Sequence, residues 1–426
     1  MIDALYTAQS GLFTSRYAIE TTSNNIANEN TEGYKKRVSE ISELSSLEDN
    51  IGNGVSFDDV SRTTNQYLYN QILTQVSQEE YYSQEDEILS QMEVLFSETD
   101  TSGLSVTISD YFESIENLRS NPNSDIYKTN LETQSESLII GLQSLYNDVE
   151  DLKENISTQL NDDVEEVNKL LEQIVYINQE IQDNGESNDL LDKRDQLELE
   201  LTSYGDIEVN TDNDNYQLKV GGVTTIFNNT NLHEITVMED GDSTYLAIYE
   251  KEINLSSGSL NSLVNNLDED ISPISSALQS LDDFANALIT EVNANSTSDL
   301  FSGDSVSNIS FNSSSLNDLT NDDLENLAQI QWSDDINIDS TTSETSSFSD
   351  FYQALRVDIS SQVESNAFLL DAQETVVQSL QTTYNNQTKV DTDEEMINLI
   401  EYQAAYEANA KVITVVDEML QTILNM

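Results

Sequence analysis

The sequence has no cysteine, only 2 prolines and 13 glycines, and few basic residues. Without cysteine the chain has no disulfide, no thiolate zinc site and no cysteine nucleophile. The scarcity of proline and glycine permits long helices. No run stays apolar over the roughly 20 residues that cross a bilayer. The N-terminus also lacks the basic and apolar stretches of a cleaved secretory signal, so we expect no membrane anchor and no signal-dependent export.

The charge balance is strongly acidic. Lys and Arg number 16 against 80 Asp and Glu, a formal net charge of −64. This charge repels nucleic-acid phosphates and anionic membrane surfaces, so we expect neither as a partner. The acids are spread along the chain rather than arrayed, which disfavours a nucleic-acid mimic and favours solubility in salty surroundings. We interpret the one basic run, Lys35, Lys36 and Arg37, as a solvated loop or helix end.

Residue patterns that support catalysis or metal binding are missing. His233 is the only histidine, and we interpret it as a surface residue rather than a catalytic base. Asp212, Asp214 and Tyr216 resemble the start of a calcium loop, but the glycine at the sixth position is missing, so we predict a turn. The sequence predicts no catalytic residue, no metal site and no cofactor site, and we expect that the chain is not an enzyme.

Both ends of the chain carry seven-residue apolar repeats, which keep one stripe of a helix against a partner helix. The N-terminal repeat is Leu5, Leu12, Ile19 and Ile26. The C-terminal repeat is Leu399, Tyr406, Ile413 and Leu420, with Tyr402, Asn409, Val416 and Ile423 beside it. We predict that these two ends pair with each other or with neighbouring subunits, as in an assembling protein.

Asn409 is the polar residue within the C-terminal stripe. A buried Asn at one seam position can fix the register and partner number of a coiled coil. The alternative is that Asn409 sits at the edge of the stripe and is solvated. The sequence leaves both interpretations open.

Apolar spacing divides the rest of the chain into helices and a strand-rich middle. A polar connector ending in the turn signal Ile51–Gly54 follows the first helix, and residues 295–349 are interpreted as loops with short strands. We expect Thr392 or Asp393 to cap the last helix. Helices are predicted over residues 3–27, 65–96, 108–118, 126–182, 189–203, 271–292, 351–388 and from 392 onward, with a run of hairpins from 207 to 249.

These elements predict a mainly α fold. We expect a long antiparallel helical bundle formed from the N- and C-terminal halves, with a small antiparallel β domain inserted at its far tip and paired coiled-coil helices at the termini. The expected divisions are residues 1–58 with 392–426 for terminal assembly, 59–205 with 262–391 for the bundle, and 206–261 for the β domain.

Both terminal segments resemble the signatures of the flagellar axial family, which comprises rod, hook and hook-associated proteins. The N-terminal match is Thr22-Ser-Asn-Asn-Ile-Ala-Asn28 followed by Gly33-Tyr34, and the C-terminal match runs from Leu399 to Ile413. The resemblance adds Asn24, Asn25, Asn28, Gly33 and Tyr34 to the candidate assembly residues.

The middle of the chain resembles the members of this family that join hook to filament. The similar segments are residues 104–152, 190–209 and 281–295. The resemblance implies a structural protein outside the cell, exported through the flagellar type III apparatus, that forms a tubular homo-oligomer without a cofactor. Its partners would be the hook protein on one side, a second hook-associated protein or the filament on the other, and an export chaperone.

Three alternatives remain from the sequence. A hook or distal rod protein would share the terminal signatures but require a mostly β middle. An acidic coiled-coil binding module would explain the helices and the charge, but not the terminal signatures. A cell-wall hydrolase would need a pair of acids in a cleft, which sequence spacing does not reveal.

Overall fold

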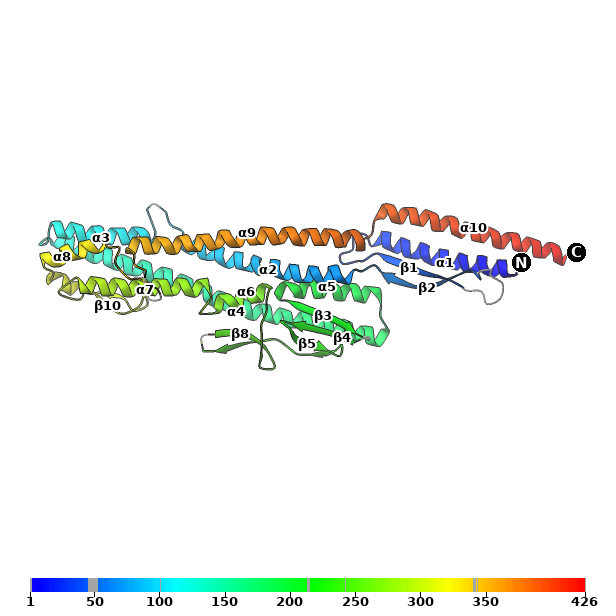
Figure 1. Cartoon of the computed structure of the whole chain (residues 1–426), viewed down its shortest axis with the longest axis horizontal. Coiled ribbons are helices and arrows are strands. Elements are labelled where there is room, and N and C mark those ends of the chain that lie inside the picture. Colours follow the sequence, from blue (N-terminus) through cyan, green and yellow to red (C-terminus); the bar gives the residue numbers. More distant parts are fainter. Residues whose placement is uncertain are drawn as a thin grey trace.

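The computed structural model describes residues 2–44, 53–99, 101–212, 215–241, 243–339, 342 and 344–425. The molecule is elongated, and helices run along most of its length (Figure 1). Both termini lie at the same end, because the first and last helices are antiparallel neighbours. The turn signal at Ile51 and Gly52 and the acid at Asp214 lie outside the described residues.

We call the part at this end the terminal module. It consists of α1 (Ile2–Ala27), β1 (Arg37–Glu43), β2 (Val55–Arg62) and α10 (Thr392–Leu424). The strands form an antiparallel hairpin within the segment expected to be a polar connector, so that expectation was incomplete. Asp391, rather than Thr392 or Asp393, caps α10 by accepting from two backbone amides, because it alone precedes the first helical turn.

The bundle carries the main apolar core. Its longest member, α4, is a single helix of 60 residues with a buried side chain at nearly every turn. The two halves of the chain meet where α2 packs along α9. The bundle helices are α2 (Gln66–Leu95), α3 (Leu104–Ser120), α4 (Asp125–Asn184), α5 (Asn188–Tyr204), α6 (Ser259–Leu267), α7 (Pro273–Ala294), α8 (Asn321–Ile330) and α9 (Phe348–Thr388).

Two small antiparallel sheets form the β part, with strand orders β3-β4-β5-β6 and β7-β8-β9. They contact α4, α5 and α6 on the flank of the bundle (Figure 1). Besides the β1–β2 hairpin, a further two-stranded sheet pairs β10 with β11. The strands are β3 (Ile207–Asp212), β4 (Asn215–Val220), β5 (Val223–Phe227), β6 (Asn231–Leu232), β7 (Thr236–Asp240), β8 (Ser243–Ile248), β9 (Lys251–Ile253), β10 (Phe301–Ser302) and β11 (Ser310–Phe311).

Three local expectations were wrong. The β part does not cap the far tip, because α3 and α8 occupy that end and the chain leaves the bundle for the sheets directly after α5 (Figure 1). The segment expected to be loops contains the helix α8, whose start is closed by a capping box between Thr320 and Asp323. Ile271 is exposed and precedes α7, because Ser272 and Pro273 begin that helix.

The predicted fold class is confirmed: the protein is mainly helical, with packed terminal helices and small inserted antiparallel sheets. Within the described residues, no helix is both long and apolar enough to span a membrane. The three-part division of the chain stays a prediction.

Candidate assembly surface and its junction with the bundle

The heptad residues line the contact between α1 and α10, but small side chains occupy its most buried positions. Small residues let two helices approach closely, and the larger apolar residues flank this line. On α1 the buried residues are Ala8, Thr14, Ser15, Ala18, Thr22 and Asn25. Leu5, Leu12, Ile19, Ile26, Leu399, Tyr402, Tyr406, Asn409, Ile413 and Leu420 are half-buried, Val416 is buried and Ile423 is exposed.

Asn409 lies at this contact, directly against Gly11 of α1. It is half-buried rather than fully solvated. The position therefore fits the seam better than the edge of the stripe. A role in fixing the register stays a prediction.

A second apolar face on α10 was not recognised in the sequence. Ile397, Ile400, Val415 and Met419 are all exposed, and at 3.6 residues per turn they lie on the side of the helix opposite the seam. Exposed Ala404 continues this face between them. Exposed Lys411 and Glu418 lie on the same side of the helix, so the apolar side chains form two groups, and apolar side chains exposed together on one face mark an interaction site. We call the five apolar residues the outer face of α10.

Asn25 joins three elements at the base of the terminal module, and it is almost fully buried. Its amide nitrogen donates to the carbonyl oxygen of Arg37 at 2.8 Å and to the carboxylate of Glu395 at 2.9 Å. Its amide oxygen accepts from the backbone nitrogen of Arg37 and the hydroxyl of Tyr34, each at 2.9 Å. One side chain thus links α1, the start of β1 and α10 with every polar atom satisfied.

The other signature residues shape the turn that leads to this contact. Asn28 donates to the carbonyl oxygen of Asn24 at 3.0 Å and so closes the end of α1. Gly33 has a φ of +74°, and a Cβ there would overlap the side chain of Gln196 on α5. Glycine is needed for both reasons, the left-handed backbone and the close approach. Burial raises the pKa of Tyr34 to about 12.

The basic run is not solvated, so that interpretation was wrong. Lys35 and Arg37 are buried, and Lys36 is mostly covered. The run lies between the terminal module and α5, where acidic partners compensate each cation. Lys35 pairs with Asp195, Lys36 with Glu394 and Glu395, and Arg37 with Asp189 and Asp192.

A buried carboxylate extends this charge cluster into the bundle. Glu198 of α5 accepts from the hydroxyls of Tyr69 at 3.1 Å and Tyr216 at 2.9 Å. The Nε atom of Arg194 lies 3.6 Å from the carboxylate oxygen Oε1 of Glu198. Burial raises the pKa of Glu198, and the cationic Arg194 opposes that effect. The cluster thereby connects the terminal module, α2, α5 and β4.

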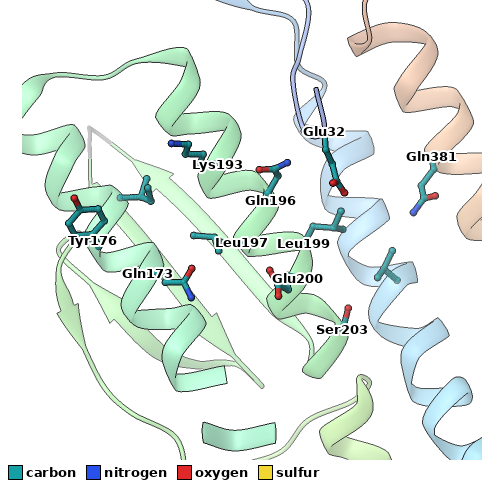
Figure 2. A pocket seen from close by; sticks show the side chains of 13 residues that line it. Glu32, Gln173, Tyr176, Lys193, Gln196, Leu197, Leu199, Glu200, Ser203 and Gln381 are labelled. Atoms are coloured by element: carbon teal, nitrogen blue, oxygen red, sulfur yellow. The ribbon is translucent and has the colours of Figure 1, made fainter. Parts of the chain in front are cut away.

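A surface groove of about 760 Å³ lies beside this junction (Figure 2). Tyr176 and Gln173 come from α4, Lys193 and Glu200 from α5, and Glu32 from the turn after α1. Its lining mixes apolar, amide and charged side chains, with Glu32 and Glu200 as its acids.

No group of three or more metal-binding side chains occurs in the part of the chain that the structure describes. His233 is half-buried rather than a plain surface residue, because its ring lies 4.8 Å from that of Phe227 and 4.3 Å from that of Tyr249. Such contacts are typical of packing.

Three family models match the chain. The flagellar hook-associated protein FlgK helical domain matches residues 89–311, just over half of the chain. The flagella basal body rod protein model matches residues 5–35, and the C-terminal model of the flagellar basal body rod FlgEFG proteins matches residues 381–426. The two rod-type matches include the terminal signatures. The match to the FlgK helical domain covers most of the bundle and the β part.

Named relatives agree with these matches. Flagellar hook-associated protein 1 of Bacillus subtilis is 26% identical over 99% of this chain and 97% of its own length. The Escherichia coli protein of the same name is 28% identical over 49% of this chain and 40% of its own length. In fold, the chain is similar to the flagellar hook junction protein FlgK from Burkholderia pseudomallei, with a TM-score of 0.50, 20% identity, and coverage of 55% of this chain and 46% of that one. The chain is therefore a non-enzymatic structural component of the flagellum and belongs to the family of flagellar hook-associated protein FlgK.

Proposed function

We propose that this protein self-assembles into the tubular junction between the hook and the filament of a bacterial flagellum. Copies meet through the terminal module. The heptad residues from Leu5 to Ile423 and the signature residues from Asn24 to Tyr34 build this assembly module within each copy, and the outer face of α10 meets the neighbouring copy. The hook protein borders the junction on one side, and a second hook-associated protein or the filament borders it on the other.

The outer face of α10 is the observation that carries this proposal. One face of α10 is used by α1 within the same chain, and the opposite face leaves Ile397, Ile400, Val415 and Met419 in contact with water. Burying such surface contributes about 25 cal/mol per Å². A second copy of the chain is the occupant that family membership supports. A hook or rod protein is disfavoured, because the middle of this chain is helical.

Export before assembly follows from the same proposal. The subunit leaves the cell unfolded through the flagellar type III apparatus, with an export chaperone, and functions outside the cell. Isolated helices are marginal in water, and a chain without cysteine forms no crosslinks on the way. The terminal helices gain their full stability when neighbouring copies cover the outer face of α10.

A matched pair of substitutions tests self-assembly. Ile400 on α10 is 67% exposed and Ile140 on α4 is 66% exposed, and both lie within helices. We expect Ile400→Glu to abolish polymerisation of the purified protein and to leave its helix content unchanged. Ile140→Glu makes the same chemical change outside the terminal module and should polymerise like the wild type. Sedimentation of polymer at a series of protein concentrations measures both.

The position in the flagellum needs a separate readout. Antibody labelling of intact flagella from wild-type cells should mark one band where the hook ends. Labelling along the rod, along the whole hook, or nowhere on the flagellum would contradict the proposed location. Equal polymerisation of the two glutamate variants would contradict the proposed surface.

A further inference from the structure

Two arginines face each other at the end of the β1–β2 hairpin nearest the bundle. Arg37 is the first residue of β1, Arg62 is the last of β2, and the antiparallel register pairs them directly. Like charges directly opposite on neighbouring strands destabilise a hairpin. The hairpin packs along α1, and the arginine pair at its base needs a compensating charge from outside the hairpin.

Asp192 of α5 supplies this charge to both strands at once. One carboxylate oxygen lies 2.6 Å from Arg37, and the other lies 3.2 Å from Arg62. Asp195, one turn further along α5, lies 2.6 Å from Arg62 and also pairs with Lys35. The repulsive register pair thus becomes a bridged cluster only when the hairpin lies on α5.

Burial makes this contact selective. The side chains of Asp192 and Arg37 are 9% and 6% exposed, so docking removes both charges from water. Removing ions from water is costly, and the cost is recovered only when the geometry pairs every charge. A shifted register or a rotated module would leave a buried charge alone. One arrangement of hairpin and bundle is therefore strongly preferred over its neighbours.

Two hydrogen bonds to backbone carbonyls hold the same joint, one of them from the side chain of Asn188. Asn188, at the first turn of α5, donates to the carbonyl oxygen of Val60 in β2 at 2.6 Å. The backbone nitrogen of Lys36 donates to the carbonyl oxygen of Thr388, the last residue of α9, at 2.7 Å. These bonds leave little freedom between the two parts once the charges have paired.

We propose that Asp192 is a positioning residue: it completes the β1–β2 hairpin and thereby fixes the terminal module in one orientation on the bundle. The hairpin packs along α1 and its base meets α5, and α1 and α10 are then directed along the long axis of the molecule (Figure 1). The importance of this fixed orientation for polymerisation rests on the proposed function. The docking itself is a property of the single chain.

Hydrogen exchange in the full-length monomer tests the docking. Asp192→Asn keeps the shape of the side chain but removes its charge. We expect amides of residues 37–43 and 55–62 to exchange at least tenfold faster in this variant, with α4 and α7 unchanged. Asp189→Asn is the matched control. Asp189 is also on α5 and lies 3.0 Å from Arg37, but it is 85% exposed, so its loss should change exchange less than twofold.

The bridging role predicts a specific rescue. Arg62→Gln removes the like-charge pair. The hairpin amides of the double variant should therefore exchange at least threefold more slowly than those of Asp192→Asn alone. If Asp192 only stabilised α5, the effects of the two substitutions on exchange would be additive.

Additive effects would overturn the proposal. It is also overturned if the hairpin amides exchange freely in the wild type or stay protected in Asp192→Asn. Faster exchange of the bundle helices in Asp192→Asn would overturn it as well. These monomer results do not depend on whether the protein polymerises.

Discussion

Gly11 of α1 lies directly against the side chain of Asn409 on α10. A Cβ on Gly11 would be 2.8 Å from the amide nitrogen of Asn409 and 3.0 Å from both its amide carbon and its amide oxygen. Flipping the amide therefore does not relieve the contact, and Asn409 would need a new rotamer. The contact leaves no free space for a side chain at position 11 of α1.

Gly11→Ala should weaken the pairing of the terminal helices, although alanine favours an isolated helix by about 1 kcal/mol. Overlap with Asn409 should outweigh that gain and raise the critical concentration for polymerisation about fivefold, which corresponds to about 1 kcal/mol. Asn409→Ala removes the obstacle, so the double variant should return toward the wild type. Easier polymerisation of Gly11→Ala alone would show that helix propensity dominates and that the contact is loose.

Asn25→Ala should destabilise the base of the terminal module. The substitution leaves the buried carboxylate of Glu395 and the backbone of Arg37 without their amide partner. Each unsatisfied buried group costs about 1–3 kcal/mol. Asn24→Ala is the matched control, because Asn24 is the preceding residue and is exposed. Hydrogen exchange of the start of α10 should rise strongly for the first variant and little for the second, and equal effects would contradict the role of Asn25.

The stability of the junction should depend on pH through Lys35. Burial, with the neighbouring Arg62 as the next cause, lowers the pKa of Lys35 to about 8 from the ordinary 10.5. Between these values the unfolded chain binds more protons than the folded one, so the stability contributed by Lys35 rises with pH. The cost of burying its charge is fully present below pH 8.

Urea unfolding of the wild type and of Lys35→Met from pH 7 to 9.5 measures this effect. The difference in unfolding free energy should change by at most about 1.4 kcal/mol per pH unit, in favour of the wild type as pH rises. The window ends below pH 10, because the raised pKa of Tyr34 acts in the opposite direction above the ordinary tyrosine value. Parallel curves for the two proteins would contradict a lowered pKa.

Polymerisation should be promoted by salt. Each added subunit brings a formal charge of −64 close to others of the same sign. The Debye length falls from about 30 Å at 0.01 M to about 10 Å at 0.1 M ionic strength, which screens this repulsion. The critical concentration should fall steadily over this range, and NaCl and KCl should act alike. A polymer that dissolves as salt is added would contradict the prediction.

Long periodic segments were predictable from sequence, and contacts between distant segments were not. The first and last helices, and α4 with its regular buried face, follow from apolar spacing alone. The basic run was misread because its acidic partners come from α5 and α10, more than 150 residues later in the chain. Nothing near Lys35 or Arg37 in the sequence indicates that such partners exist.

The hairpin was missed for a related reason. Its strands alternate polar and apolar residues only weakly, and the Arg37–Arg62 pair is unfavourable until Asp192 joins it. Likewise, the C-terminal heptads identified the seam, but α10 has a second apolar face that seven-residue spacing does not reveal. The candidate residues were identified as a set, whereas their individual contacts required the structure.

Deleting the gene tests the proposed role at the hook–filament junction, with electron microscopy of the cells and a measurement of flagellin in the medium. A protein that joins hook to filament predicts cells with complete bare hooks, no filaments, and flagellin released into the medium. Cells without hooks would place the protein below the junction, and cells with normal filaments would remove it from the flagellar axis altogether. Either result would contradict a role in joining hook to filament.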